Sequence, residues 1–406
     1  MPPPVPPAPD AARDFLVRIA RLLHRYGTPA HRLERVLQKV ATGLGEEASF
    51  FVTPTSVFAA FGAFPDVRTY LVRSDSGEVD LGKLVEFDDV MEDVEHGRCG
   101  VAVATQRLDA IAAAPPRYPP SVTALSFGIA SACAACFFAG GGPEVALSFA
   151  LGLATFALGR LLAQRSEGLS VFEPLAAFVA AAVALAMAHF TALDHRVVTL
   201  SSLIVLVPGL TLTTGMIELA TRHLVSGVAR LAGAATTFLT ILLGVALAWR
   251  LGEALAPLRP AQTPHPLPPW AVWAALAVAP LAFGILLHAR PRELGVIYLT
   301  GVVGFLAARF GAVALGKDLG AFLGALVVGL AGNLYARALD RPSSVPVTPG
   351  ILLLVPGSLG YRSLTSFLDR EALAGMEWAF QTSLVAVSLV GGLLAANVLL
   401  PPRRVL

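Results

Sequence analysis

Residues 201–220, SSLIVLVPGLTLTTGMIELA, decide how the second part of this chain folds. The run carries no charge before its last turn, yet Pro208 and Gly209 stand near its middle. Proline removes a backbone donor and clashes with the preceding helical turn, and glycine adds backbone freedom. We therefore expect a helix that breaks or kinks at this pair.

A second copy of the pattern lies at residues 351–363, ILLLVPGSLGYRS, with Pro356 and Gly357 in the corresponding place. The hydrocarbon core of a membrane tolerates freed backbone groups only where protein or a water-filled cavity satisfies them. Two matched, interrupted segments in the two halves of a chain are therefore a strong pointer to the substrate site of a transporter.

The composition is that of an integral membrane protein. Of 406 residues, 55% are hydrophobic and only 14% are charged, whereas soluble proteins carry roughly 25% charged residues. The net charge is +2 and no basic block indicates a nucleic-acid partner. The three cysteines are too few for a disulfide framework, and we expect no metal site.

The first part of the chain has a different character. Residues 1–13 are proline-rich and are expected to be disordered. Residues 14–118 combine an interrupted amphipathic helical pattern, short β-prone runs and two further helical stretches, which predicts a small soluble α/β domain. Because the N-terminus lacks the basic and apolar regions of a signal peptide, this domain is expected in the cytoplasm.

After Pro120 the chain consists of apolar segments, most of them near the ~20 residues that span a bilayer. Ten such segments are expected, at residues 121–139, 144–163, 172–190, 197–217, 228–249, 269–288, 293–311, 318–337, 345–362 and 376–399.

The segments fall into two sets of five. A proline-rich linker at residues 251–268 separates a first repeat, 119–250, from a second, 269–400, and a tail follows at 401–406. A repeat with an odd number of spans enters the membrane from opposite sides when it occurs twice, so the halves are predicted to be inverted. The predicted fold class is an all-α polytopic membrane protein of about ten helices, preceded by the α/β domain.

Polar side chains at membrane depth are costly and mark candidate functional positions. The first Pro-Gly pair is followed by three hydroxyls and a carboxylate, Thr211, Thr213, Thr214 and Glu218. These groups suit a small zwitterionic or hydroxylated solute, and Glu218 is a candidate proton carrier. The alternative is that the hydroxyls bond back to their own helix and that Glu218 lies at the cytoplasmic surface.

The second half offers fewer candidates. Ser358 and Tyr361 follow the second break, and Arg362 marks either the cavity or the helix end. Asn333 lies deep in an apolar segment, and Glu173 is a second candidate proton carrier unless it serves only as a charge at a helix N-terminus. The predicted substrate site also includes the breaks themselves, Pro208, Gly209, Pro356 and Gly357.

Other motifs have structural explanations. In DDVME, residues 88–92, the acidic side chains resemble a metal–diphosphate motif without its partner motif, so a solvated acidic helix face is expected. His31 and Glu34 stand three residues apart, where a surface helix with ion pairs is expected. The chain contains no nucleophile elbow, zinc-protease or nucleotide-binding motif, so we expect neither an enzyme nor an ATP-driven pump.

Four stretches together resemble the threonine/serine exporter family. They are LLHRYGTPAHRLERVLQKVATGLG, TPTSVFAAFG, SSLIVLVPGLTLTTGMIELA and LLLVPGSLGYRS, and the resemblance extends over nearly the whole chain. It implies proton-driven export of a small amino acid across the inner membrane of a bacterium. In some members the two halves occur as separate proteins linked to succinate export, and the linker at 251–268 is where such a split would fall.

We therefore expect a secondary, proton-coupled antiporter that exports threonine and serine and needs no cofactor. The substrate would bind between the two breaks, where half-helix N-termini attract a carboxylate. A dicarboxylate exporter is the alternative, and there Arg362 would matter more than the carboxylates. A membrane-embedded enzyme that uses the N-terminal domain, or a non-transporting scaffold, would belong to a different class. The small-residue surface in the lipid bilayer is compatible with a homodimer.

Overall fold

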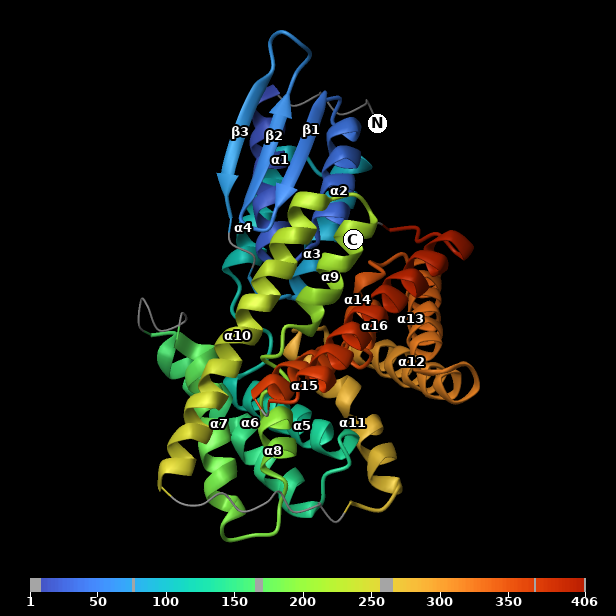
Figure 1. The fold of residues 1–406 in the computed structure, drawn as a ribbon. Helices are drawn as coiled ribbons and strands as arrows, with labels where there is room; N and C mark the ends of the chain where they lie inside the picture. The colour runs from blue at the N-terminus through green and yellow to red at the C-terminus, as the bar shows by residue number, and fades with distance from the viewer. Residues whose placement is uncertain (1–8, 75–76, 165–170, 256–265, 369, 405–406) are drawn as a thin grey trace.

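A mixed α/β unit sits at one end of a larger, entirely helical part (Figure 1). The computed structural model describes residues 9–74, 77–164, 171–255, 266–368 and 370–404. We call residues 9–113 the α/β domain. Its elements are α1 (Pro9–Arg25), α2 (Ala30–Gly43), β1 (Ala48–Thr53), β2 (Ser56–Phe61), β3 (Arg68–Arg73), α3 (Leu81–Glu95) and α4 (Val101–Ala113).

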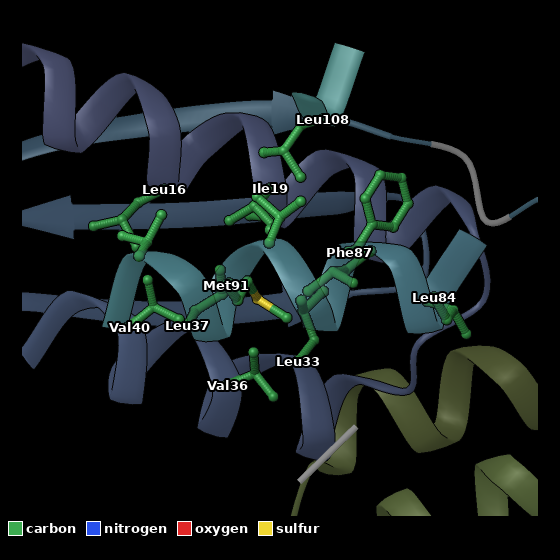
Figure 2. Packing of buried hydrophobic residues seen from close by; sticks show 14 of the residues in the cluster. Leu16, Ile19, Leu33, Val36, Leu37, Val40, Leu84, Phe87, Met91 and Leu108 are labelled. Carbon is green, nitrogen blue, oxygen red and sulfur yellow. The ribbon is translucent and has the colours of Figure 1, made fainter. Parts of the chain in front are cut away.

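The three strands form an antiparallel sheet in the order β1-β2-β3, and β1 and β2 are joined by a tight turn at Pro54. Alternate side chains of the sheet, such as Val52 and its partner Val57, are buried against the helices. Figure 2 shows the leucine-rich faces of α1 and α2 meeting Phe87 and Met91 of α3. The apolar residues of the predicted helical pattern therefore form the core of this domain.

One boundary differs from the expectation. α1 begins at Pro9, so residues 9–13 are helical rather than disordered. Proline suits the first turn of a helix because its fixed φ matches the helix and its missing N–H has no partner there. The rest of the predicted disordered stretch lies outside the described residues.

The helical part confirms a polytopic membrane protein. In chain order its elements are α5 (Pro120–Phe137), α6 (Gly142–Leu162), α7 (Phe172–Ala188), α8 (His195–Ser202), α9 (Gly209–Ala220), α10 (Leu224–Leu255), α11 (Trp270–Leu286), η2 (Pro291–Glu293), α12 (Leu294–Leu315), α13 (Lys317–Leu339), α14 (Ser344–Leu352), α15 (Gly357–Leu368) and α16 (Ala372–Leu399). Within the described residues, seven helical stretches are long and apolar enough to cross a membrane, and α7 and α11 are shorter apolar helices.

The helix α10 is longer than expected. It continues to Leu255, past the predicted boundary at 250, because Leu251 and Ala254 prolong its apolar pattern. Figure 1 shows α10 running from the α/β domain along α7 to the opposite end of the molecule. Of the predicted linker, residues 256–265 lie outside the described part of the chain.

The two Pro-Gly pairs interrupt their helices as predicted, and the interruptions touch each other. α8 stops at Ser202 and α9 starts at Gly209, while α14 stops at Leu352 and α15 starts at Gly357. A Cβ atom added to Gly209 would lie 2.2 Å from Val355 Cγ1 and 3.4 Å from Gly357 Cα. Glycine is therefore required at the contact because no side chain fits between the two breaks.

The contact predicts a specific packing defect. Gly209→Ala should destabilise the protein by about 1–3 kcal/mol, the usual cost of overpacking, because the β-branched Val355 side chain cannot rotate away freely. Adding Val355→Ala, which removes the clashing methyl group, should restore most of the loss. Thermal unfolding in detergent measures both effects.

Gly295→Ala is the matched control, because a Cβ at this helical glycine meets nothing within 4 Å. It should leave the melting temperature unchanged or raise it slightly, since alanine favours helix over glycine. Equal melting temperatures for Gly209→Ala and Gly295→Ala would contradict a tight contact between the breaks.

Candidate functional site

A cavity of about 760 Å³ lies between the α/β domain and the helical part. Residues of α9, α10, α13, α14 and α16 line one side, and the α1–α2 turn, α2 and the β1–β2 turn line the other. Because α9 and α14 belong to the two interrupted helices, we call this space the α9–α14 cavity. Its threonines, asparagines and arginines form a polar lining between apolar walls.

The first turns of α9 bring the three predicted threonines into this cavity. The hydroxyl of Thr213 is buried and has no hydrogen-bond partner. By contrast, Thr221 at the end of the same helix donates back to the Ile217 carbonyl at 2.9 Å. The alternative explanation, in which such hydroxyls only bond to their own helix, is therefore wrong for Thr213.

Other unpaired polar atoms gather around the same space. Among the described residues, the buried side-chain atoms without a hydrogen-bond partner include four that line the cavity, Thr28 Oγ1, His31 Nδ1, Thr213 Oγ1 and Ser344 Oγ. Buried polar groups are usually satisfied, and a cluster of exceptions calls for an explanation. A polar ligand or water in the cavity would supply the missing partners.

The charge of the lining is one-sided. Arg32, Arg35 and Arg230 line the cavity, and its described lining contains no aspartate or glutamate. Burial, followed by the neighbouring Arg35, lowers the pKa of Arg32 to about 10. Burial and then the surrounding cationic groups hold the pKa of His31 well below its usual range, so this imidazole is neutral near pH 7. The cavity is therefore suited to an anionic group.

Asn333 also lines the cavity, but its amide group is already engaged. Its Nδ2 donates to Asn397 Oδ1 at 2.9 Å and to the Leu400 carbonyl at 2.8 Å. These bonds join α13 to the end of α16, so Asn333 supports the wall of the cavity.

The remaining predicted residues occupy three other places. Gly209 and Gly357 form the contact between the breaks, and Pro208 and Pro356 directly precede them. Tyr361 and Arg362 line a second cavity of about 240 Å³, together with residues of α8 such as Arg196, and we call it the α8–α15 cavity. Ser358 and Glu173 are absent from the described linings of both cavities.

Glu218 is fully buried, so the alternative of an exposed carboxylate at the surface does not hold. It accepts hydrogen bonds from Ala30 N–H at 2.8 Å and from Ser226 Oγ at 2.7 Å, and Arg230 Nε donates to both of its oxygens at 3.0 Å. Since Ala30 begins α2, the Glu218 carboxylate sits at the N-terminus of that helix, where the helix dipole favours a negative charge. Glu218 thus fastens the α/β domain to α9 and α10.

Glu34 makes a second fastening beside it. Its Oε1 accepts from Val52 N–H at 2.8 Å, and its Oε2 accepts from His223 Nε2 at 3.1 Å. His31 points elsewhere, into the cavity lining. The prediction that His31 and Glu34 lie on a surface helix with ordinary ion pairs is therefore wrong. Glu34 binds His223 of the helical part, and His31 faces the cavity.

The acidic face of α3 forms the third fastening. Asp89 pairs with Arg341 at 2.6 Å, and Arg404 bridges Asp88 at 2.9 Å and Glu92 at 2.5 Å. Burial, partly opposed by Arg404, raises the pKa of Asp88 to about 6. The prediction of a solvated acidic face is wrong because arginines distant in sequence cover it. Within the described residues no group of three side chains is arranged to hold a metal ion.

The α/β domain contributes Thr28, Arg32 and Arg35 to the cavity, and these residues were not predicted from the sequence. The only signal in the sequence is the turn Gly27-Thr28-Pro29, which is followed closely by the basic residues Arg32 and Arg35. Arg230 was missed as well, although an arginine within an apolar stretch is a recognisable signal.

These features define a multi-pass membrane protein with a polar cavity beside a pair of interrupted helices. The chain belongs to the threonine/serine exporter family. A family profile for threonine/serine exporters matches residues 14–252, and a second profile, described as Threonine/Serine exporter, ThrE, matches residues 272–399. The resemblance seen in the sequence is thereby confirmed, and the gap between the two profiles falls at the predicted linker.

The chain is also similar to eukaryotic membrane proteins. Pheromone-regulated membrane protein 10 of Candida albicans is 28% identical over 364 residues, which is 86% of this chain and 33% of the relative. The protein of that name in Saccharomyces cerevisiae is 28% identical over 370 residues, 87% of this chain and 47% of the relative. The chain thus spans between a third and a half of the length of these relatives. No solved structure matches it.

The Glu218 fastening predicts how the α/β domain is held. Glu218→Ala should destabilise the protein by about 3–5 kcal/mol, because it leaves the largely buried Arg230 without its partner. The linker between α4 and α5 should also become more sensitive to protease as the domain loosens. Thermal unfolding and limited proteolysis in detergent measure the two effects.

Glu253→Ala is the control, since its pair with Arg250 lies on α10 but is exposed. It should change the melting temperature little, because exposed ion pairs contribute about 0–1 kcal/mol. Similar effects of the two substitutions would contradict a fastening role for Glu218.

The neutral His31 predicts a dependence of stability on pH. It faces Arg32, Arg35, Arg230 and His223, all of which oppose its protonation. Below about pH 6.5 the unfolded chain gains a proton that the folded chain does not take up, so the free energy of unfolding falls as the pH falls, by up to about 1.4 kcal/mol per pH unit.

His31→Gln should therefore flatten the decline of the melting temperature between about pH 6.5 and 5. His96→Gln serves as the control, because His96 is exposed at the end of α3. Parallel profiles for wild-type protein and His31→Gln would contradict the burial of a neutral imidazole.

Proposed function

We propose that this protein is a secondary exporter of threonine and serine, driven by the proton gradient, in the inner membrane of a bacterium. The observation that carries the proposal is the pair of cavities on the two interrupted helices. The α9–α14 cavity holds the hydroxyls expected to bind a small polar solute. Family membership supports export as the direction of transport.

The arrangement of the half-helices supports an inverted repeat of five plus five spans. α9 follows the first break and α14 precedes the second, yet both line the same cavity. Likewise, α8 precedes the first break and α15 follows the second, and both line the α8–α15 cavity. Two parallel repeats would instead pair α9 with α15. Each of the ten predicted segments coincides with a helix or a pair of half-helices, and we propose that each is one span.

Alternating access follows from this geometry. With the α/β domain in the cytoplasm, the α9–α14 cavity is the inward-facing site and the α8–α15 cavity lies on the outward path. The contact between Gly209 and Gly357 separates the two. Rocking of one five-helix repeat against the other would open the path on one side as it closes on the other. The apolar outer surface faces lipid, and part of it is available for a homodimer.

Proton coupling is assigned to Glu218, with Glu173 as the second candidate. Protonation of Glu218 would remove the charge that holds Arg230 and the N-terminus of α2. The proton would thereby loosen the α/β domain at the edge of the cavity. We propose no cofactor and no enzymatic reaction.

One observation favours a second candidate, a dicarboxylate such as succinate. The described lining of the α9–α14 cavity has three arginines and no acidic side chain to meet the ammonium group of an amino acid. Because Arg230 is paired with Glu218, the two charges of a dicarboxylate would match those of Arg32 and Arg35. In this case the arginines of the α9–α14 cavity would bind the dicarboxylate, a role that was expected of Arg362 from the sequence.

Counterflow in proteoliposomes decides between the candidates. Vesicles loaded with unlabelled threonine should accumulate labelled threonine and serine, and a pH gradient should increase the accumulation. Accumulation of succinate alone would favour the second candidate. Correctly folded protein that accumulates none of the three would contradict the exporter.

Thr213→Val tests the site within this assay. Valine keeps the shape of threonine but removes the unpaired hydroxyl, so the apparent KM for threonine should rise about 5- to 20-fold, as for the loss of one hydrogen bond. Thr236→Val on the exposed face of α10 should leave transport unchanged. Equal kinetics for the two variants would remove Thr213 from the site.

A further inference from the structure

We propose that the α/β domain supplies part of the substrate site, with Arg32 and Arg35 of α2 binding the substrate carboxylate inside the α9–α14 cavity. The inference rests on the proposed function and extends it, because it makes the cytoplasmic domain a participant in substrate binding. The ligand class is a small carboxylate, whether it belongs to an amino acid or to a dicarboxylate.

Arg32 and Arg35 have no acidic partner among the described residues. Other arginines of the α/β domain are paired with carboxylates, as Arg13 is with Glu46 and Arg107 is with Asp93. Within the described residues, neither Arg32 nor Arg35 has a carboxylate within 4 Å. Both line the cavity, Arg32 partly buried and Arg35 exposed, so two guanidinium groups border the same space with their charges uncompensated.

Glu218 already satisfies two other groups at this wall of the cavity. Its carboxylate takes the free N–H of Ala30 at the start of α2 and also neutralises Arg230. The N-terminus of α2 and the third arginine of the lining are therefore satisfied by the protein itself. Arg32 and Arg35 remain as the unneutralised cations on this wall.

Two unpaired hydroxyl groups indicate a ligand at the same place, independently of charge. Thr28 of the α1–α2 turn and Thr213 of α9 are 2% and 1% exposed, and both hydroxyls lack a hydrogen-bond partner while they line the cavity. One comes from the α/β domain and the other from the helical part. A ligand that formed hydrogen bonds with both hydroxyls would bridge the two parts of the molecule. A ligand whose carboxylate binds Arg32 and whose hydroxyl group binds Thr213 would bridge them in the same way.

The electrostatic state of Arg32 agrees with this role. Burial and the adjacent Arg35 lower its pKa to about 10, so the guanidinium is still charged at neutral pH but lies in an unfavourable surrounding. A bound carboxylate would relieve both effects. The planar guanidinium fork also matches the two oxygens of a carboxylate, which lysine cannot reproduce.

Equilibrium binding to the purified full-length protein in detergent tests the proposal, with L-threonine, L-threonine amide and succinate as probes. The amide keeps the hydroxyl and the ammonium group but lacks the carboxylate charge. Arg32→Gln and Arg35→Gln should each raise the Kd for threonine, or for succinate if that is the ligand, at least tenfold. The Kd for the amide should change less than twofold.

Arg68→Gln on the exposed strand β3 is the matched control and should leave every Kd unchanged. Arg32→Lys should recover only part of the affinity, which a merely structural role would not predict. Since Arg35 is exposed, Arg35→Gln reports on the site even if Arg32→Gln fails to fold.

Two results would overturn the inference in distinguishable ways. If Arg35→Gln and folded Arg32→Gln bind the wild-type ligand with wild-type Kd, the arginines are not part of the site while the proposed function stands. If wild-type protein binds neither threonine nor succinate, the proposed function fails and this inference fails with it.

Discussion

The contact between Gly209 and Gly357 is the constraint on which the rest of the structure depends. Each proline–glycine pair ends one half-helix and begins another, and the absence of side chains lets the two breaks touch. Of the four half-helices, α9 and α14 line one cavity and α8 and α15 line the other. Backbone freed by the breaks thus lies within protein, where a membrane tolerates it.

The α/β domain forms the remaining wall of the α9–α14 cavity. Three fastenings, at Glu218, Glu34 and the acidic face of α3, hold it over the wider cavity. The pair of Glu218 with Arg230 is largely buried and the other two are partly buried. A buried pair contributes modestly to stability but fixes one arrangement, since removal of either partner leaves an unpaired charge. The same groups that fix the domain also decide which cations remain free inside the cavity.

The sequence alone predicted the features that local chemistry determines. The breaks at Pro208 and Pro356 follow from backbone geometry, and the threonines of α9 lie on the same short segment as the first break. Arg32 reaches the cavity only because α2 docks on α9, an element far away in the chain, and no local pattern encodes that contact. For the same reason Asp89 looked solvated, although Arg341 covers it. Features that depend on the docking of segments distant in the chain could not be predicted from the sequence.

Side-specific labelling of one cysteine tests the central claim, that the α9–α14 cavity is a substrate site open toward the α/β domain. The three native cysteines are replaced, Thr214→Cys is introduced in the cavity, and oriented vesicles are treated with a membrane-impermeant maleimide. We predict that Thr214→Cys is labelled from the side of the α/β domain and that L-threonine or succinate slows the labelling. Thr365→Cys, in the α8–α15 cavity, should be labelled from the opposite side only. Labelling of Thr214→Cys from the opposite side, or at a rate that neither solute changes, would contradict it.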